Sequence, residues 1–442
     1  MMQKNTIHYT SLISEYAFIT YFFILSFFPF SRIKLLCLLT VVGCWIARML
    51  REKKILFAKT TLTVPILSFL VCSLISSFHS AHAMNSLETV LHDYCVYFTI
   101  FFCMVNTIDS QEQIRRIVKA LLITCGLVCL YGLYGYYTGI AIRDGRFIAT
   151  FEYHSRIAKY ISMFLPVALC LFFSYKNRAI RFSLACLIFV CGFSLILTMS
   201  RTSWVSIFIA IFFASFALQK KRLILILIGI CMLLIFFLPA KFINQAKTIT
   251  QVNQFFTSEK ILGERLLCWK AAIAIIHDHP WLGIGSGKKN FRFVYQQYAE
   301  TIRDREKHLE KEPVRKQDQE KKSRKKIQVE NIERLSHPHN IFLHIWVGNG
   351  IVGLLSFLWM FTMVFYTAIR SWRLSKAGYE KALLLGIVAG LVSIFLHGLT
   401  DSFWKKPDAL FLWYIIGILF AVIHLISSNS QNEFLLKGEN KS

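Results

Sequence analysis

A short histidine-rich segment, His337-Pro-His-Asn-Ile-Phe-Leu-His344, leads into a long apolar run. Proline suits the first turn of a helix, so we place His339 and Asn340 at a helix N-terminus. The positive end of the helix dipole disfavours imidazolium there, which leaves His339 able to accept a proton. A lone histidine at such a place is usually interfacial, but several histidines beside arginines favour a general base. His339 is therefore the candidate base, with His337 and Asn340 in support and His344 as a structural residue.

The second group of candidates consists of arginines. Arg201 lies in Thr198-Met-Ser-Arg-Thr-Ser203, a very short hairpin between two apolar runs. A guanidinium is always charged, and its planar fork of donors suits phosphate oxygens. The alternative is an arginine that extends to lipid headgroups. Because few carboxylates match the cations on this side of the chain, we favour a diphosphate site; the further cations are Arg143, Arg146, Arg156 and Arg265.

Acidic residues are scarce near these groups. Asp401 follows His397-Gly-Leu-Thr, where it either orients a histidine, pairs with an arginine or is an ordinary carboxylate at a helix end. Asp93 is the main acid inside an apolar run. Because no cluster of carboxylates suits Mg²⁺, we expect neither a metal nor a cofactor. The glycines of 283–287 fail the P-loop pattern, since Lys289 replaces its Ser/Thr, and they predict a turn.

These residues are set among runs that predict an all-α membrane protein. The chain has 442 residues, is 55% hydrophobic and carries 40 Phe against 25 acidic residues. Each apolar run approaches the ~20 residues that cross a bilayer. We predict about twelve transmembrane helices, at 14–30, 33–49, 61–78, 90–106, 117–140, 158–175, 182–199, 204–218, 222–239, 341–368, 383–399 and 409–427.

The loops between these runs alternate between many and few basic residues. Basic loops stay in the cytoplasm, which places both termini there and the candidate residues on the periplasmic side. The predicted organisation is nine helices in 1–239, a large periplasmic loop at 240–338, helices ten to twelve in 339–427 and a cytoplasmic tail at 428–442. The loop is partly helical near 264–276, and its charged insertion, 303–334, is typical of a solvated segment or of one that contacts anionic lipid.

Charge and cysteine content narrow the function further. The net charge of +25 lies in loops rather than in a recognisable basic module, which argues against nucleic acid as a partner. Of the 12 cysteines only Cys268 falls in the large loop, so the loop has no disulfide framework.

Four blocks resemble the O-antigen ligase and polymerase superfamily of bacterial inner-membrane glycosyltransferases. They are Gly145-Arg-Phe-Ile-Ala-Thr-Phe151 with Ala158; Leu197-Thr-Met-Ser-Arg201; Glu264-Arg265 with Trp269 and His279-Pro-Trp-Leu-Gly-Ile-Gly285; and His339-Asn-Ile-Phe-Leu343 with Gly350 and Gly353. The resemblance extends from Arg143 to the twelfth span, whereas the N-terminal helices match only in hydropathy. The sequence departs from the family at Gly348, where an acid is common, at His154, where Asn is common, and in the 303–334 insertion.

The resemblance implies a metal-independent, inverting glycosyltransferase that uses an undecaprenyl-diphosphate glycan as donor on the periplasmic face. It implies that Arg201 and Arg265 hold the donor diphosphate and that His339 deprotonates the acceptor hydroxyl. Arg146 and Asp401 are supporting candidates. The expected protein is an O-antigen ligase of the inner membrane, with lipid A-core as acceptor and membrane lipids as further partners.

Other functions remain open on the sequence alone. Within the superfamily the alternatives are an O-antigen polymerase and a protein O-oligosaccharyltransferase. A flippase or secondary carrier can also use many spans and an anion-binding arginine group, although intramembrane carboxylates are few. A non-catalytic scaffold is the last alternative. Transfer of labelled glycan by purified protein in detergent, without an energy source, would distinguish an enzyme from the last two.

Overall fold

The computed structural model is a helical bundle, described over residues 2–28, 32–54, 57–220, 225, 262–309 and 337–439. The predicted ninth span at 222–239, the start of the large loop and most of the charged insertion lie outside the described residues. The elements in chain order are α1 (Met2–Phe27), α2 (Ile33–Glu52), α3 (Thr63–His79), α4 (Ala83–Thr89), a π-helical turn (Val90–Tyr94), α5 (Cys95–Thr107), α6 (Gln111–Tyr137), β1 (Ile142–Arg143), β2 (Arg146–Phe147), α7 (His154–Ser174), α8 (Arg178–Leu197), α9 (Arg201–Ala217), α13 (Leu262–Asp278), α14 (Lys288–Leu309), α16 (Ile341–Leu374), α17 (Tyr379–Gly398) and α18 (Asp408–Glu439).

The apolar helices confirm the predicted class of all-α membrane protein. Within the described residues, 9 helices are long and apolar enough to cross a membrane, and α3 and α9 are shorter apolar helices. Every predicted span except 222–239 overlaps one of these helices. The full count of spans and the division into domains stay predictions.

Some helices start several residues away from the predicted range, and at α6 the reason is a polar cap before the apolar run. The span predicted at 117–140 begins instead at Gln111. Ser110 accepts a hydrogen bond from the Gln113 backbone N–H, and the Gln113 side chain accepts one from the Ser110 backbone. This capping box supplies partners for the free N–H groups of the first turn. Hydropathy does not register such polar turns.

The close contact between α7 and α17 positions the candidate site. A Cβ on Gly390 would lie 2.4 Å from the Met163 carbonyl oxygen, and one on Gly386 would lie 2.7 Å from Val167 Cα. Small residues let membrane helices approach to this distance. The start of α7 is thereby held beside the end of α17, where Asp401 follows.

A turn between α13 and α14 is inserted against a kink in α16. Gly350 has φ 66° and ψ −173°, and a Cβ there would lie 2.0 Å from the Trp281 carbonyl oxygen. The freed backbone groups find partners, since Ile284 N–H donates to Val347 O and Ile351 N–H to Pro280 O, both at 2.9 Å. Gly283, Gly285 and Gly287 all have positive φ, so the predicted glycine turn is confirmed.

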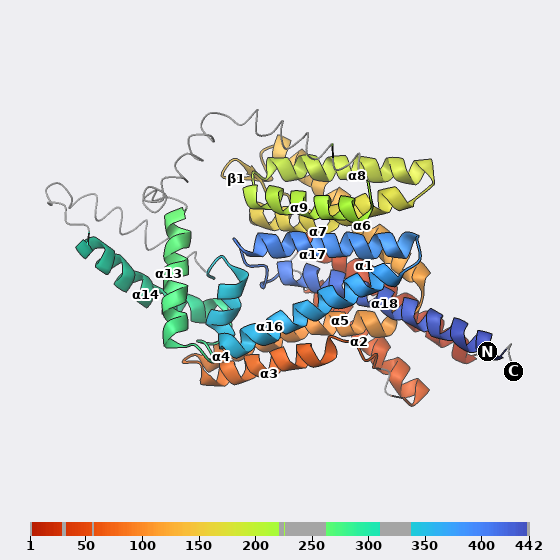
Figure 1. Cartoon of the computed structure of the whole chain (residues 1–442), viewed down its shortest axis with the longest axis horizontal. Coiled ribbons are helices and arrows are strands. Elements are labelled where there is room, and N and C mark those ends of the chain that lie inside the picture. Colours follow the sequence, from red (N-terminus) through yellow and green to blue (C-terminus); the bar gives the residue numbers. More distant parts are fainter. Residues whose placement is uncertain are drawn as a thin grey trace.

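The predicted helix near 264–276 is α13, and it packs on the bundle. Cys268, Ala271 and Ile275 are fully buried in one apolar cluster with Val347 of α16. Figure 1 shows α13 running across the end of the bundle at which α4 and β1 also lie. The start of α1 and the end of α18 lie at the opposite end. The polar residues described next therefore share one end of the bundle, away from the termini.

Candidate active site

A buried carboxylate, that of Asp401, gathers polar side chains from separate parts of the chain. Its Oδ1 lies 2.9 Å from His337 Nε2 and 3.5 Å from His339 Nδ1. Its Oδ2 lies 3.0 Å from Lys159 Nζ. We call these four residues the Asp401 centre. The sequence left three roles open for Asp401. In the structure its carboxylate contacts two histidines, and its charge partners are lysines rather than arginines.

The start of α16 fixes the two histidines of the Asp401 centre. Asn340 caps the helix, since its Oδ1 accepts from the N–H groups of Phe342 and Leu343 at 2.9 and 3.1 Å. Its Nδ2 donates to Leu399 O at 3.0 Å, which ties this cap to the end of α17. His339 precedes the cap with φ +52°, a conformation that histidine tolerates better than most residues. Pro338 lies before the cap, not within the first turn as predicted.

Lys159 is the residue of this centre that sequence reasoning missed. Its side chain is 1% exposed, and its Nζ lies 2.5 Å from Asp408 Oδ2 as well as 3.0 Å from Asp401 Oδ2. Asp408 is itself 3% exposed. A buried ammonium is stable only with paired counter-charges. The available signal was a lysine inside the apolar run predicted at 158–175, which in a membrane protein requires an acidic partner.

Charge and burial set the ionisation of the loop residues in this centre. Burial by itself raises the pKa of Asp401, but Lys159, Lys405 and the neighbouring histidines reverse this and hold the pKa well below its usual value. Burial and the charge of Lys405 lower the pKa of His337 well below normal. The carboxylate is therefore ionised and His337 neutral at pH 7.

Lys405 gives the centre a testable pH dependence. Burial, only partly offset by Asp401, lowers the pKa of Lys405 from 10.5 to about 8. Between these values the unfolded chain binds more protons than the folded chain, so the free energy of unfolding should rise with pH. Lys405→Met should flatten this rise. Thermal unfolding of both purified proteins across the interval from about pH 8 to 10.5 measures the difference; parallel pH curves would contradict it.

Arg146 is presented by a tight hairpin. Asp144 and Gly145 both have positive φ (51° and 71°), which suits a two-residue turn, and they join Arg143 to its partner across the strands, Arg146. Arg146 Nη1 lies 2.9 Å from His154 Nε2 at the start of α7. The hairpin thus directs a guanidinium toward the helix that carries Lys159.

Arg201 and Arg265 approach the same end of α17 from two other elements. Arg201 is the first residue of α9, and its near neighbour Ser203 Oγ lies 2.9 Å from His397 Nδ1 of α17. Arg265 is carried by α13, and its charge acts on both His154 and His397. We call Arg146, Arg201 and Arg265 the arginine group. His397, which bonds Ser203 and precedes Asp401 by four residues, connects this group to the Asp401 centre.

Two interpretations of the sequence are wrong in detail. Arg156 is not an unmatched cation, because its Nη1 lies 2.8 Å from Glu152 Oε2. Asp93 is not buried; it lies in the π-helical turn within the apolar helix Ala83–Thr107, is partly exposed and pairs with Lys406 at 2.6 Å. Glu152 and Lys406 lie in loops, where hydropathy does not indicate which charges will be paired. His344 is buried with its Nδ1 2.5 Å from Ser402 Oγ, which agrees with a structural role.

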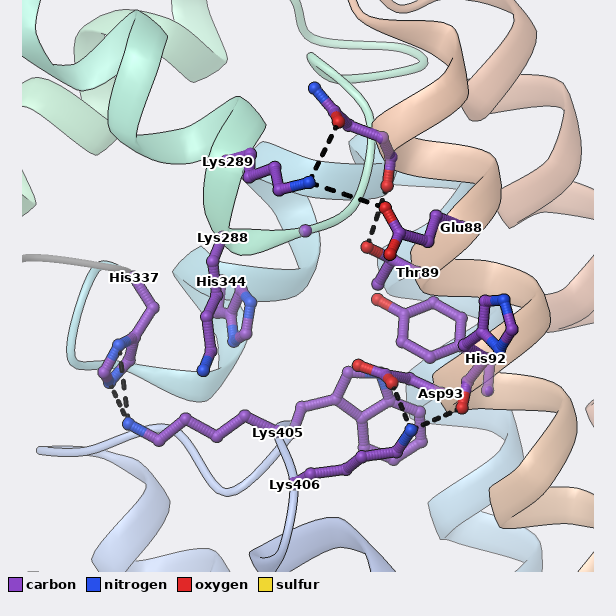
Figure 2. A pocket seen from close by; sticks show the side chains of 14 residues that line it. Glu88, Thr89, His92, Asp93, Lys288, Lys289, His337, His344, Lys405 and Lys406 are labelled. Atoms are coloured by element: carbon purple, nitrogen blue, oxygen red, sulfur yellow. Dashed lines mark hydrogen bonds and ion pairs between the residues drawn. The ribbon is translucent and has the colours of Figure 1, made fainter. Parts of the chain in front are cut away.

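A cavity of about 330 Å³ adjoins the Asp401 centre at His337. Four lysines line it, together with two acids, Glu88 and Asp93. Figure 2 shows Lys288 and Lys405 with their amines on the same side of the cavity as His337, whereas Lys289 and Lys406 reach the acids on the other side. We call this the lysine cavity, defined by Lys288, Lys289, Lys405 and Lys406.

The donor atoms of His337, His339 and Asp401 lie within 4.8 Å of one another, which is close enough for them to share a metal ion. Lys159 and Lys405 already direct ammonium groups at the same carboxylate, at 3.0 and 3.9 Å. A divalent ion would be repelled by both ammonium groups. The donor set therefore fits a hydrogen-bonded charge network better than a metal centre.

Fold and site together define a multi-pass, all-helical membrane protein with a cationic polar centre at one end of its bundle. The sequence profile of the family described as O-antigen ligase matches residues 184–358, which confirms the resemblance to the O-antigen ligase superfamily. The match supports a function of the ligase or polymerase type, in an enzyme that resembles glycosyltransferases. The matched segment includes Arg201, Arg265 and His339, whereas Arg146 and Asp401 lie outside it. No curated protein matches the chain significantly.

Proposed function

We propose that this protein is an O-antigen ligase, which transfers polysaccharide from undecaprenyl diphosphate to lipid A-core at the periplasmic face of the inner membrane. The observation that carries the proposal is a histidine held against a buried carboxylate beside the arginine group. A base on one side and cations on the other are the two requirements for displacing a diphosphate by a hydroxyl.

His339 acts as the base in this scheme. Its Nδ1 is buried and faces Asp401 Oδ1 at 3.5 Å, while the side chain as a whole is 23% exposed. The exposed edge is therefore the one that carries Nε2. The acceptor hydroxyl gives its proton to Nε2 as its oxygen attacks the anomeric carbon, and Asp401 stabilises the resulting imidazolium. Lys159 acts as a positioning residue, because it holds Asp401 ionised and in place.

The arginine group receives the leaving diphosphate. As the bond between the anomeric carbon and the diphosphate oxygen breaks, negative charge grows on the lipid diphosphate, and Arg201 and Arg265 stabilise it. Direct, in-line attack inverts the anomeric configuration. Analysis of donor and product anomers tests this step, and a trapped glycosyl-enzyme would contradict it.

Deletion of the gene tests the biological role. Loss of all O-antigen on lipid A-core supports a ligase, whereas core capped with a single repeat supports a polymerase. Complementation with the intact chain should restore the normal pattern on a lipopolysaccharide gel. Unchanged lipopolysaccharide in the deletion strain would exclude both roles.

Arg201→Lys should lower the transfer rate about 10²-fold. Lysine keeps the charge but loses the fork that holds two phosphate oxygens together. The rate is measured with purified protein, labelled lipid-linked glycan and saturating acceptor. Arg178→Lys, the same change at the opposite end of the bundle, is the matched control and should leave the rate unaltered. If the two variants transferred glycan at equal rates, the assignment of Arg201 to the donor diphosphate would be wrong.

A further inference from the structure

The lysine cavity carries a local excess of positive charge on one side. Lys406 is neutralised by Asp93 at 2.6 Å, and Lys289 lies 3.5 Å from Glu88. Across the cavity, Lys288 is exposed and has no hydrogen bond or ion pair with any residue that the structure describes. It stands near His344, on which its charge acts. The half of the cavity next to His337 therefore lacks a balancing anion.

Lys405 adds to this excess. Its Nζ lies 2.9 Å from His337 Nε2, and its nearest carboxylate oxygen, Asp401 Oδ1, is 3.9 Å away. Asp401 is already paired with Lys159 at 3.0 Å, so one carboxylate faces two ammonium groups. Two amines, those of Lys288 and Lys405, thus remain to bind an anion (Figure 2).

The rest of the cavity wall suits a sugar. Tyr94 and Trp404 contribute aromatic groups to this wall; their ring centroids are 5.7 Å apart, and each residue is 3% exposed. Asn85 and Thr89 add neutral polar groups to the lining. A volume of about 330 Å³ lies at the lower end of the range for small-molecule sites. Aromatic faces with a few polar groups and a cationic end fit a monosaccharide that bears a negative charge.

The position of the cavity relates it to the acceptor. His337 lines the cavity, its Nε2 lies 2.9 Å from Asp401 Oδ1, and its ring centroid lies 4.4 Å from that of His339. The arginine group instead reaches the Asp401 centre through His154 and His397. An attacking hydroxyl and a leaving group must lie on opposite sides of the anomeric carbon. If the arginine group holds the leaving diphosphate, the lysine cavity lies on the acceptor side.

We propose that the lysine cavity binds an anionic substituent, a phosphate monoester or a carboxylate, on the acceptor sugar. Lys288 and Lys405 hold the anion while Trp404 and Tyr94 support the ring, and the hydroxyl that reacts is thereby brought to His339. The acceptor role of the cavity rests on the proposed function. The binding of an anionic sugar does not depend on it.

Calorimetric titration of the purified full-length protein in detergent tests the binding. Glucose 6-phosphate and glucuronate serve as probes, with glucose as the neutral control. We expect either anionic sugar to bind more tightly than glucose, and Lys288→Gln to weaken that binding about tenfold, the effect of losing one charge-assisted hydrogen bond. Lys288→Glu should abolish it. Lys176→Gln, which removes an exposed lysine at the opposite end of the bundle, should leave it unchanged.

Two outcomes would overturn the binding site: equal affinity for glucose and both anionic sugars, or equal affinity of Lys288→Gln and Lys176→Gln. A lipid headgroup is the other source of a phosphate. Nanodiscs with and without phosphatidylglycerol separate the two, because a headgroup ligand would make anionic lipid compete with glucose 6-phosphate and would leave the sugar no better than inorganic phosphate. That result would also overturn the proposal.

The acceptor role has its own test. Glucose 6-phosphate should inhibit glycan transfer competitively against the acceptor and not against the lipid-linked donor. Competition with the donor would overturn the assignment to the acceptor. If the protein bound the anionic sugar but transferred no glycan, the proposed function would be wrong and the anion site would still be supported. Failure of the proposed function and failure of the anion site are therefore distinguishable.

Discussion

His339→Asn should lower the rate of glycan transfer about 10²- to 10⁴-fold, the contribution of a positioned general base. Asparagine suits this position because, like histidine, it tolerates the left-handed backbone conformation found there, φ +52°. The substitution thus removes the base without straining the start of α16. The rate is measured with purified protein and labelled lipid-linked glycan, with donor and acceptor both saturating.

The control for this variant is a histidine outside the site. His424 is exposed midway along α18, whose first residue, Asp408, pairs with Lys159 of the Asp401 centre. His424→Asn should transfer glycan at the rate of the unaltered protein. If His339→Asn did the same, the role of His339 as base would be wrong, and the Asp401 centre would be a structural charge network. Thermal unfolding of both variants checks that equal amounts of folded protein are compared, so that a lower rate is not caused by misfolding.

Lys159→Met is the second change from which we expect a large effect, about 3–5 kcal/mol less stability. The ammonium at this position is the link between Asp401 and Asp408, at 3.0 and 2.5 Å, and all three side chains are buried. Its removal leaves two buried carboxylates facing each other without the central cation. Thermal or denaturant unfolding in detergent measures the loss.

A double-mutant cycle identifies the cause of that loss. Asp408→Asn removes one of the two carboxylates, so adding it to Lys159→Met should recover part of the stability. The two substitutions should therefore be coupled. Independent effects that simply add would show that Lys159 stabilises the fold by packing. Lys159→Arg, which keeps the charge, should lie between the unaltered protein and Lys159→Met.

Much of the fold was predictable because the bilayer imposes a length on each helix. An apolar run of ~20 residues is visible in a sequence, and α2, α8 and α17 correspond closely to the predicted runs. The polar ends were less predictable. α6 begins at a capping box, a hydrogen-bonded feature that hydropathy does not register, and α4 precedes the run predicted at 90–106.

The candidate site was predictable where residue type was itself unusual. Arg201 and His339 were selected because a permanent cation and a helix-end imidazole are uncommon beside apolar runs. Lys159 was missed because its meaning depends on Asp401 and Asp408, which lie more than two hundred positions away along the chain. The residues around 159 indicate that an acidic partner is needed, but not which acids supply it.

The sequence by itself determined the class of membrane protein, most of the apolar helices that the structure describes, and several of the polar residues at one end of the bundle. The tertiary structure alone decided which of these residues meet: that Asp401 takes two lysines and two histidines as neighbours, that Arg156 is neutralised by Glu152, and that four lysines surround one cavity. The physical reason is that helix formation in a membrane depends on short-range hydropathy, whereas ion pairing depends on helix packing. That packing is set by contacts such as Gly390 against Met163, between residues far apart in the chain.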